Sequence, residues 1–303
     1  MDETTPAVRW LPALAIAVYL ALHVWLRYDL KWGYGKRWQA LHVLIGLGTV
    51  GAIVYAAHWR HIFRRLDRSG VAVLAVSSVC YLLFWYLGRS DTYLLYLAPH
   101  LSSQSPVASI YPIIYLSLAA FFFRLLVPFV VGARLARRRP RDLGLGSGKG
   151  GRTSKVLWIY VGLYVAVAPV VWMVSDDPDF TAKYPLARGL IAPDGSIGWG
   201  AFLVYQGFYA LIFVSGEALY RGFMVFGLER QLGLYAIAFM LVPYVFSHFG
   251  KPLPETLGAI GAGTMLAFLA LKHRSIWPGV CLHYAVALTM DISAIARQGY
   301  RLT

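Results

Sequence analysis

The chain has 303 residues, of which 58% are hydrophobic and only 14% are charged, whereas an average globular chain is roughly 25% charged. This composition excludes a disordered chain, a coiled coil and an ordinary soluble enzyme. The apolar runs are about 20 residues long, as a bilayer requires. They do not alternate with polar residues, which excludes a transmembrane barrel. We therefore predict an all-α, polytopic helical membrane protein with eight or nine transmembrane helices.

The net charge is +14, from 28 basic and 14 acidic residues. In a membrane protein such an excess usually lies in cytoplasmic loops, where it faces anionic lipid. No basic cluster is interleaved with aromatic residues in a polar domain, so we expect no nucleic-acid partner. Cys80 and Cys281 both lie inside apolar runs, and they imply no disulfide framework.

Nine apolar segments follow one another along the chain. They cover residues 10–26, 40–57, 71–88, 107–132, 156–174, 199–225, 233–249, 256–271 and 276–295. No basic region precedes the first segment, which therefore reads as a membrane helix and not as a cleaved signal peptide. The short segments after residue 233 are compatible with a re-entrant element.

The loops differ sharply in charge. Residues 58–70 and 133–155 are basic, and residues 175–198 are acidic. The basic residues are Arg60, Arg64, Arg65, Arg68, Arg134, Arg137, Arg138, Arg139, Arg141, Lys149, Arg152 and Lys155. We expect the two basic loops to be cytoplasmic, in contact with anionic lipid, and the acidic loop to be outside. The loop 27–39, which is also basic, disagrees because this topology places it outside.

A glycine-rich stretch, residues 143–151, contains the pair Gly148-Lys149. A phosphate-binding P-loop needs a glycine where Leu143 stands and a Ser or Thr where Gly150 stands. We interpret the stretch as a flexible basic linker. It divides the chain into an N-terminal four-helix region, 1–155, and a C-terminal region, 156–303.

Ionisable residues inside apolar segments are costly and are therefore candidates for function. The four strongest are Glu217, Arg221, His248 and His283, and Arg124 is weaker. Glu217 and Arg221 are four residues apart, so they share a helix face and can pair. A structural ion pair and packing histidines are the simplest alternatives. Counting residues from the helix turns places Glu217 and His248 at one depth and His283 about 10 Å lower, unless the eighth segment is short.

One carboxylate and two imidazoles that converge in a membrane can hold and activate a water molecule. They can do so directly or through a bound metal, and Glu217, His248 and His283 would make a zinc ligand set. No His-Glu-x-x-His signature is present. The residues leave both versions open: Zn²⁺ or no cofactor.

At these residues the sequence resembles the CPBP (Abi) family of intramembrane proteases, which includes the type II CAAX prenyl endopeptidases. The family's motifs are Glu-Glu-x-x-x-Arg, Phe-x-x-x-His and His-x-x-x-Asn. Their counterparts are residues 216–221 (Gly-Glu-Ala-Leu-Tyr-Arg), 244–248 (Tyr-Val-Phe-Ser-His) and 283–287 (His-Tyr-Ala-Val-Ala). The resemblance covers roughly residues 199–296.

Three positions depart from the family pattern. Gly216 replaces the first Glu, Tyr244 replaces Phe, and Ala287 replaces Asn. Asp291, eight residues after His283, is a possible substitute for the missing Asn. The stretch from His248 to Pro252, followed by Glu255, is similar to a branch of the family that carries a single Glu in the first motif.

The resemblance implies an endopeptidase that cleaves a membrane-anchored or lipid-modified protein. It also implies a multi-pass protein of the bacterial cell (cytoplasmic) membrane. Glu217 would then be the acid/base or would orient Arg221. His248 would hold the water or metal, and His283 would stabilise the oxyanion or act as a ligand. The alternative is a non-catalytic relative that binds a transmembrane or C-terminal sorting segment. A transporter is disfavoured because no inverted repeat is visible.

Overall fold

The structure is a computed structural model, and it describes residues 9–33, 35–58, 66–101, 108–146, 148, 153–186 and 188–303. Arg60, Arg64, Arg65, Lys149 and Arg152 of the predicted basic loops lie outside the described residues. Within the described part, eight helices are long and apolar enough to cross a membrane. The all-α membrane architecture predicted from the composition is therefore confirmed.

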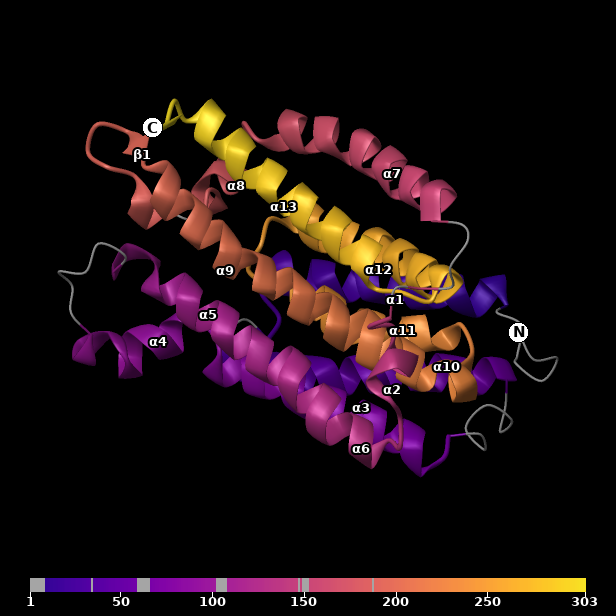
Figure 1. Ribbon diagram of the computed structural model, residues 1–303. Helices are drawn as coiled ribbons and strands as arrows, with labels where there is room; N and C mark the ends of the chain where they lie inside the picture. Colours follow the sequence, from indigo (N-terminus) through magenta and orange to yellow (C-terminus); the bar gives the residue numbers. More distant parts are fainter. Residues whose placement is uncertain are drawn as a thin grey trace.

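The helices run roughly along one axis (Figure 1). The helices that belong to the eight candidate spans are α1 (Trp10–Tyr28), α2 (Gln39–His58), α3 (Arg68–Leu87), α5 (Tyr111–Phe121), α7 (Thr153–Val174), α9 (Trp199–Glu217), α12 (Leu253–His273) and α13 (Trp277–Arg297). Shorter elements are α4 (Ser90–Tyr96), α6 (Ala133–Leu135), α8 (Pro178–Lys183), α10 (Gly227–Leu232), α11 (Tyr235–Phe246) and the strands β1 (Ser196–Ile197) and β2 (Arg301–Leu302). The strands form a parallel pair.

Two helices continue as π-helix inside the bundle. After α5 the chain is π-helical over Phe122–Leu126 and Pro128–Gly132, and after α9 it is π-helical over Ala218–Phe226. The second stretch carries the first motif. Wide turns of this kind are rare and are often found at functional sites.

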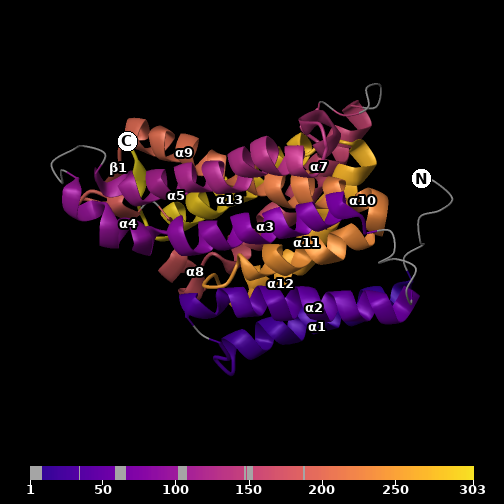
Figure 2. The same cartoon turned by 90° about the horizontal axis from the view of Figure 1, so that it is seen from below.

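The span Trp199–Leu232, which consists of α9, this π-helical stretch and α10, is the centre of the bundle. Of its most apolar window 56% is buried, against 11% for the span Val156–Val174 of α7. Figure 1 shows α7 on the outside next to α13, and Figure 2 shows α1 and α2 together along another edge. The residues of the first two motifs, Glu217, Arg221 and His248, are therefore buried among helices, and His283 of the third is partly buried.

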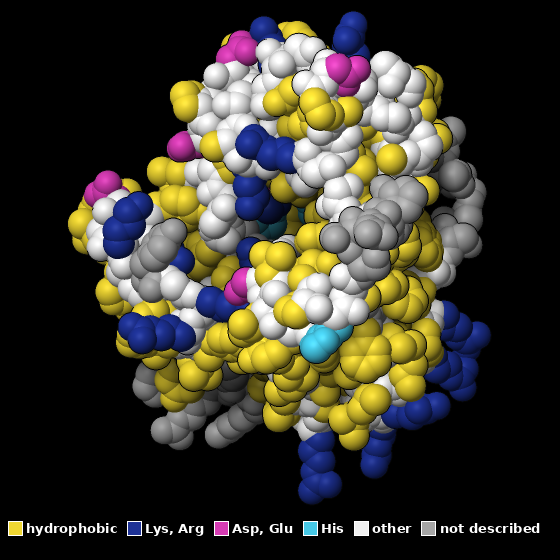
Figure 3. Space-filling view, turned by 90° about the vertical axis from the view of Figure 1, so that its left-hand side faces the viewer, with side chains coloured by type: hydrophobic (Ala, Val, Ile, Leu, Met, Phe, Trp, Pro, Cys, Tyr) yellow, Lys and Arg dark blue, Asp and Glu magenta, His cyan; other side chains and the backbone are white. Residues whose placement is uncertain are grey.

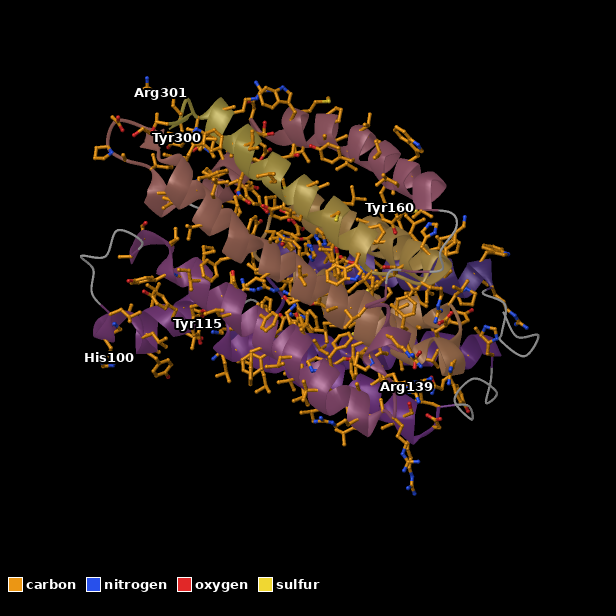
Figure 4. The ribbon with its side chains drawn as sticks, viewed as in Figure 1. His100, Tyr115, Arg139, Tyr160, Tyr300 and Arg301 are labelled. Carbon is orange, nitrogen blue, oxygen red and sulfur yellow. The ribbon has the colours of Figure 1, made fainter. Side chains whose placement is uncertain are left out.

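The two ends of the bundle carry different loops. Arg301 and Arg139, both labelled in Figure 4, lie at opposite ends. The first end, which we call the loop end, holds α8, the two strands and the turn after α1 (Figures 1 and 2). The loops 27–39 and 175–198 thus share one end, as the predicted topology requires.

The seventh predicted segment, 233–249, is shorter than a membrane span. Its helix α11 has 12 residues, which corresponds to about 18 Å, whereas the hydrocarbon core is about 30 Å thick. The helix stops at Phe246, before a turn at Gly250 with φ +91° and before Pro252. The polar loop 247–252 therefore lies at membrane depth. Such a loop is tolerated only inside protein or along a water-filled cavity.

The N-terminal and C-terminal regions share a core. One buried cluster combines Val50 and Tyr81 of the first region with Tyr244 and Phe246 of the second. Helix α2 packs closely on α11, because Gly46 has no side chain and a Cβ there would overlap Val242 and Phe246. The predicted boundary near residue 155 stays a prediction, and it does not separate two independent cores.

Candidate functional site

Glu217 and Arg221 form a buried ion pair at the junction of α9 and the π-helical stretch. Arg221 donates from Nη1 to Glu217 Oε1 over 2.7 Å, and the side chains are 0% and 1% exposed. The predicted contact between these residues is therefore confirmed. A charge in the hydrocarbon costs about 2.5–3.5 kcal/mol on insertion scales, and pairing offsets this cost.

His283 on α13 contacts the same carboxylate oxygen. Its Nδ1 lies 2.9 Å from Glu217 Oε1. A carboxylate can only accept, so Nδ1 carries the proton and Nε2 keeps a lone pair. The ring of Phe213 packs against the imidazole at 4.9 Å. Glu217 therefore orients His283 as well as neutralising Arg221.

This contact shows that His283 lies level with Glu217 and not about 10 Å lower. The residue count assumed regular α-helix between Glu217 and its turn, but the stretch Ala218–Phe226 is π-helical. A wider coil advances less per residue, which accounts for part of the difference. Gly279, one turn before His283, leaves room for the carboxylate, since a Cβ there would lie 3.3 Å from Glu217 Oε2.

His248 follows the short helix α11 and is held by the backbone of that helix. Its Nδ1 donates to the carbonyl oxygen of Tyr244 over 2.9 Å, so its Nε2 also keeps a lone pair. The Tyr244 ring lies between the histidines, with centroids 4.9 Å from His248 and 6.4 Å from His283. The Arg221 guanidinium stacks over this ring at 4.1 Å. Tyr244 therefore joins the second motif to the other two.

Arg124 stands where a side chain at Gly216 would otherwise point. The π-helical stretch after α5 carries this buried arginine, which lies over the rings of Phe84 and Tyr220 at 5.1 and 5.2 Å. A Cβ added at Gly216 would overlap the Arg124 guanidinium. The missing first Glu and the buried Arg124 are thus one structural feature. The sequence singled out Arg124 only weakly, because its segment carries no motif.

Asp291 and Glu255, which the sequence analysis also named, do not contact Glu217, His248 or His283 through any hydrogen bond between described residues. Asp291 accepts hydrogen bonds from the Leu186 amide, Tyr205 and Gln206, and makes none to His283. Eight residues of helix place it about 12 Å further along α13 than His283, and its substitution for the missing Asn stays a prediction. Glu255 pairs with Lys251 at 2.6 Å. Ala287 packs in an apolar cluster.

The tentative zinc set is not assembled as a ligand group. Within the described ranges, no three side chains of His, Cys, Asp and Glu come together in a way that could hold a metal ion. Nδ1 of both histidines is engaged by protein oxygens, which leaves Nε2 of each as the nitrogen able to face a ligand. We therefore derive no chemical step through a metal.

Several donors at the site have no protein partner in the described part of the chain. They are Nε and Nη2 of Arg221, Nε of Arg124 and the hydroxyl of Tyr220. Such groups are costly to bury without a partner. They lie near Glu217 and Tyr244, and they can stabilise negative charge on a bound molecule.

A comparison with family models identifies the region that contains this cluster. Residues 198–289 match the model described as type II CAAX prenyl endopeptidase Rce1-like. The match supports the resemblance of this region to the CPBP family. The match includes all three motifs, so the resemblance based on Glu217, His248 and His283 is confirmed for this third of the chain. No match was found among curated proteins or among solved structures.

Proposed function

We propose that the protein is an intramembrane endopeptidase that cleaves a membrane-anchored protein with an activated water molecule. The observation that supports it is the contact between Glu217 Oε1 and His283 Nδ1, which is 2.9 Å long and partly buried. This arrangement orients an imidazole whose Nε2 faces away from the carboxylate. A carboxylate that holds a histidine in this tautomer makes the second nitrogen a general base.

The proposed reaction assigns one role to each group. His283 Nε2 takes a proton from water, and the resulting hydroxide adds to the carbonyl carbon of the scissile peptide bond. Glu217 stabilises the imidazolium that forms. Arg221, with two donors free of protein partners, supplies positive charge toward the developing oxyanion. The imidazolium then returns its proton to the leaving amine, and the peptide bond breaks.

His248 has a separate role in this proposal. Its Nε2 accepts a hydrogen bond and fixes the second proton of the water, because its Nδ1 is committed to Tyr244. The acid/base role that the family resemblance gave to Glu217 thereby passes to the Glu217–His283 pair. The reason is that Glu217 Oε1 already accepts from both Arg221 and His283.

A non-catalytic binding protein is the second candidate. It is favoured by one observation: Arg124 occupies the space of the side chain missing at Gly216. In this alternative, Glu217 and Arg221 form a structural pair, and the protein binds a transmembrane or C-terminal sorting segment without cutting it.

Proteomics of protein termini separates the two candidates. Cells producing the wild-type chain should contain new N-termini in membrane proteins, and these should disappear with Glu217→Gln and with His283→Asn. The matched control is Glu229→Gln, which breaks a half-exposed ion pair with Arg274 at 2.5 Å away from the site and should leave the termini unchanged. All variants are compared at equal amounts of folded protein in the membrane. Identical termini with and without Glu217→Gln would refute the peptidase.

A further inference from the structure

A cationic hollow opens at the loop end of the bundle. It has a volume of about 320 Å³ and lies between the end of α1, helix α8 and the loop that follows His248. Figure 3, which looks at this end, shows dark-blue Lys and Arg side chains around a recess, with the cyan of a His side chain in its depth. The charged residues that line the hollow are Arg27, Lys31, Lys183, Lys251 and Asp179.

Basic side chains outnumber acidic ones in the lining of the hollow. Among the described residues that line it, Asp179 is the acid and Arg27, Lys31, Lys183 and Lys251 are the cations. Lys251 pairs with Glu255. Burial and the neighbouring Lys251 lower the pKa of Lys183, which shows that positive charges are crowded there. Lys183 makes no ion pair with any described residue.

Hydrogen bonds connect the end of α1, which lines the hollow, to the loop 247–252, which contains His248. The hydroxyl of Tyr28, at the end of α1, donates to the carbonyl oxygen of Lys251 over 2.6 Å and lies 3.3 Å from that of His248. It also contacts Thr256 Oγ1 at 2.7 Å. The end of α1 is thus fastened to both sides of the loop 247–252. Gly250, Lys251 and Pro252, which line the hollow, follow His248 within four residues.

This position explains the basic loop 27–39, which disagreed with the predicted topology. Lys36 pairs with Asp91 at 2.8 Å, and Arg37 stacks on Trp38 at 5.4 Å. Arg27 and Lys31 line the hollow. These charges have local structural uses, so they do not report the side of the membrane in the way that free loop charges do.

We infer that the hollow receives an acidic segment of the polypeptide substrate, with carboxylates lying against Lys183 and Lys251 while the adjoining peptide bond reaches His248. This inference rests on the proposed function and names the substrate class: membrane-anchored proteins with Asp or Glu beside the cleaved bond. A polypeptide fits better than a lipid headgroup. The lining includes only Leu253 as a long aliphatic side chain, and acyl chains need an apolar flank.

Binding of two matched probes tests the inference. The probes are N-palmitoylated, fluorescent octapeptides that are identical except for three Asp or three Asn residues. The full chain is held in micelles of an uncharged detergent, and fluorescence anisotropy gives the Kd. We expect the Asp probe to bind roughly tenfold more tightly at low salt, with the preference shrinking as salt screens the charges.

Two lysine variants locate the effect. Lys183→Gln should weaken the Asp probe by roughly threefold to fivefold, the range of a partly exposed ion pair, and should leave the Asn probe unchanged. Lys183→Arg should restore binding of the Asp probe. Lys272→Gln, which changes an exposed lysine at the opposite end of α12, should change neither.

Three results would overturn the inference: equal binding of the two probes, an equal loss for both with Lys183→Gln, or a loss with Lys272→Gln as large as with Lys183→Gln. Displacement of the Asp probe by phosphatidylglycerol but not by phosphatidylcholine, together with equal binding of both probes, would identify a lipid site instead. Because binding does not require Glu217, charge-selective binding without any Glu217-dependent termini would refute the peptidase and leave the hollow's ligand class intact.

Discussion

Two carboxylates are buried in the membrane region, and their surroundings differ in kind. Glu217 contacts Arg221 and His283 through one oxygen, at 2.7 and 2.9 Å. Asp291 accepts from three neutral donors, the Leu186 amide at 3.1 Å, Tyr205 at 2.6 Å and Gln206 at 3.2 Å. Both are almost completely buried. Burial alone therefore does not distinguish a catalytic acid from a structural one.

The partners of the two acids show the difference in use. The donors around Asp291 form their hydrogen bonds with that carboxylate, and these bonds connect the loop at Leu186 to α9 and α13. The partners of Glu217 keep unused hydrogen-bonding capacity. Two nitrogens of Arg221 have no hydrogen-bond partner among the described residues, and His283 Nε2 retains a lone pair. A site that acts on another molecule needs this surplus, and a structural network does not.

The largest effect should come from breaking the Glu217–Arg221 pair. Glu217→Leu and Arg221→Leu should each destabilise the protein by about 3–5 kcal/mol, because each leaves one buried charge without its partner. The double variant should recover most of the stability and remain inactive. Thermal unfolding in detergent, followed by tryptophan fluorescence, measures all three. Normal folded yield from Arg221→Leu would show that the pair has no structural role.

A smaller effect should follow from changing Asp291. Asp291→Leu should cost about 1–3 kcal/mol for the donors left without an acceptor, measured by the same unfolding assay. The yield of new protein termini per folded molecule should stay as in the wild type. The control Asp176→Asn alters an exposed acid that pairs with Arg297 at 3.1 Å and should cost about 0–1 kcal/mol. Loss of termini at full folded yield would move Asp291 into the active site.

The smallest effect tests the neighbour of Glu217 that the family pattern lacks. Gly216→Ala should destabilise by about 1 kcal/mol, the low end for an overpacked site, because the added Cβ overlaps the far end of the flexible Arg124 side chain. Arg124→Met should remove most of that penalty, since the longer cation no longer fills the space. Gly207→Ala, on the same helix with nothing within 4 Å, should be neutral or stabilising. Equal costs at the two glycines in both backgrounds would show that Arg124 and Gly216 are not coupled.

The sequence by itself determined the class of the fold and the membership of the site. Long apolar runs can only be membrane helices, because backbone groups in lipid must be satisfied within the segment. Glu217 and Arg221 were recognisable as a pair because residues four apart share a helix face. The motif order was sufficient to group them with His248 and His283.

Only the tertiary structure decided how these residues are arranged. The residue count placed His283 about 10 Å too low, which is roughly two turns of helix. Hydropathy does not distinguish π-helix from α-helix, so the π-helical stretch after Glu217 could not be predicted. Arg124 is 92 residues from Gly216 along the chain, and no local pattern links them. The length of α11 had the widest consequence. Its apolar run continues to Phe249, but the helix ends at Phe246, which places a polar loop and a cationic hollow at the depth where chemistry is proposed.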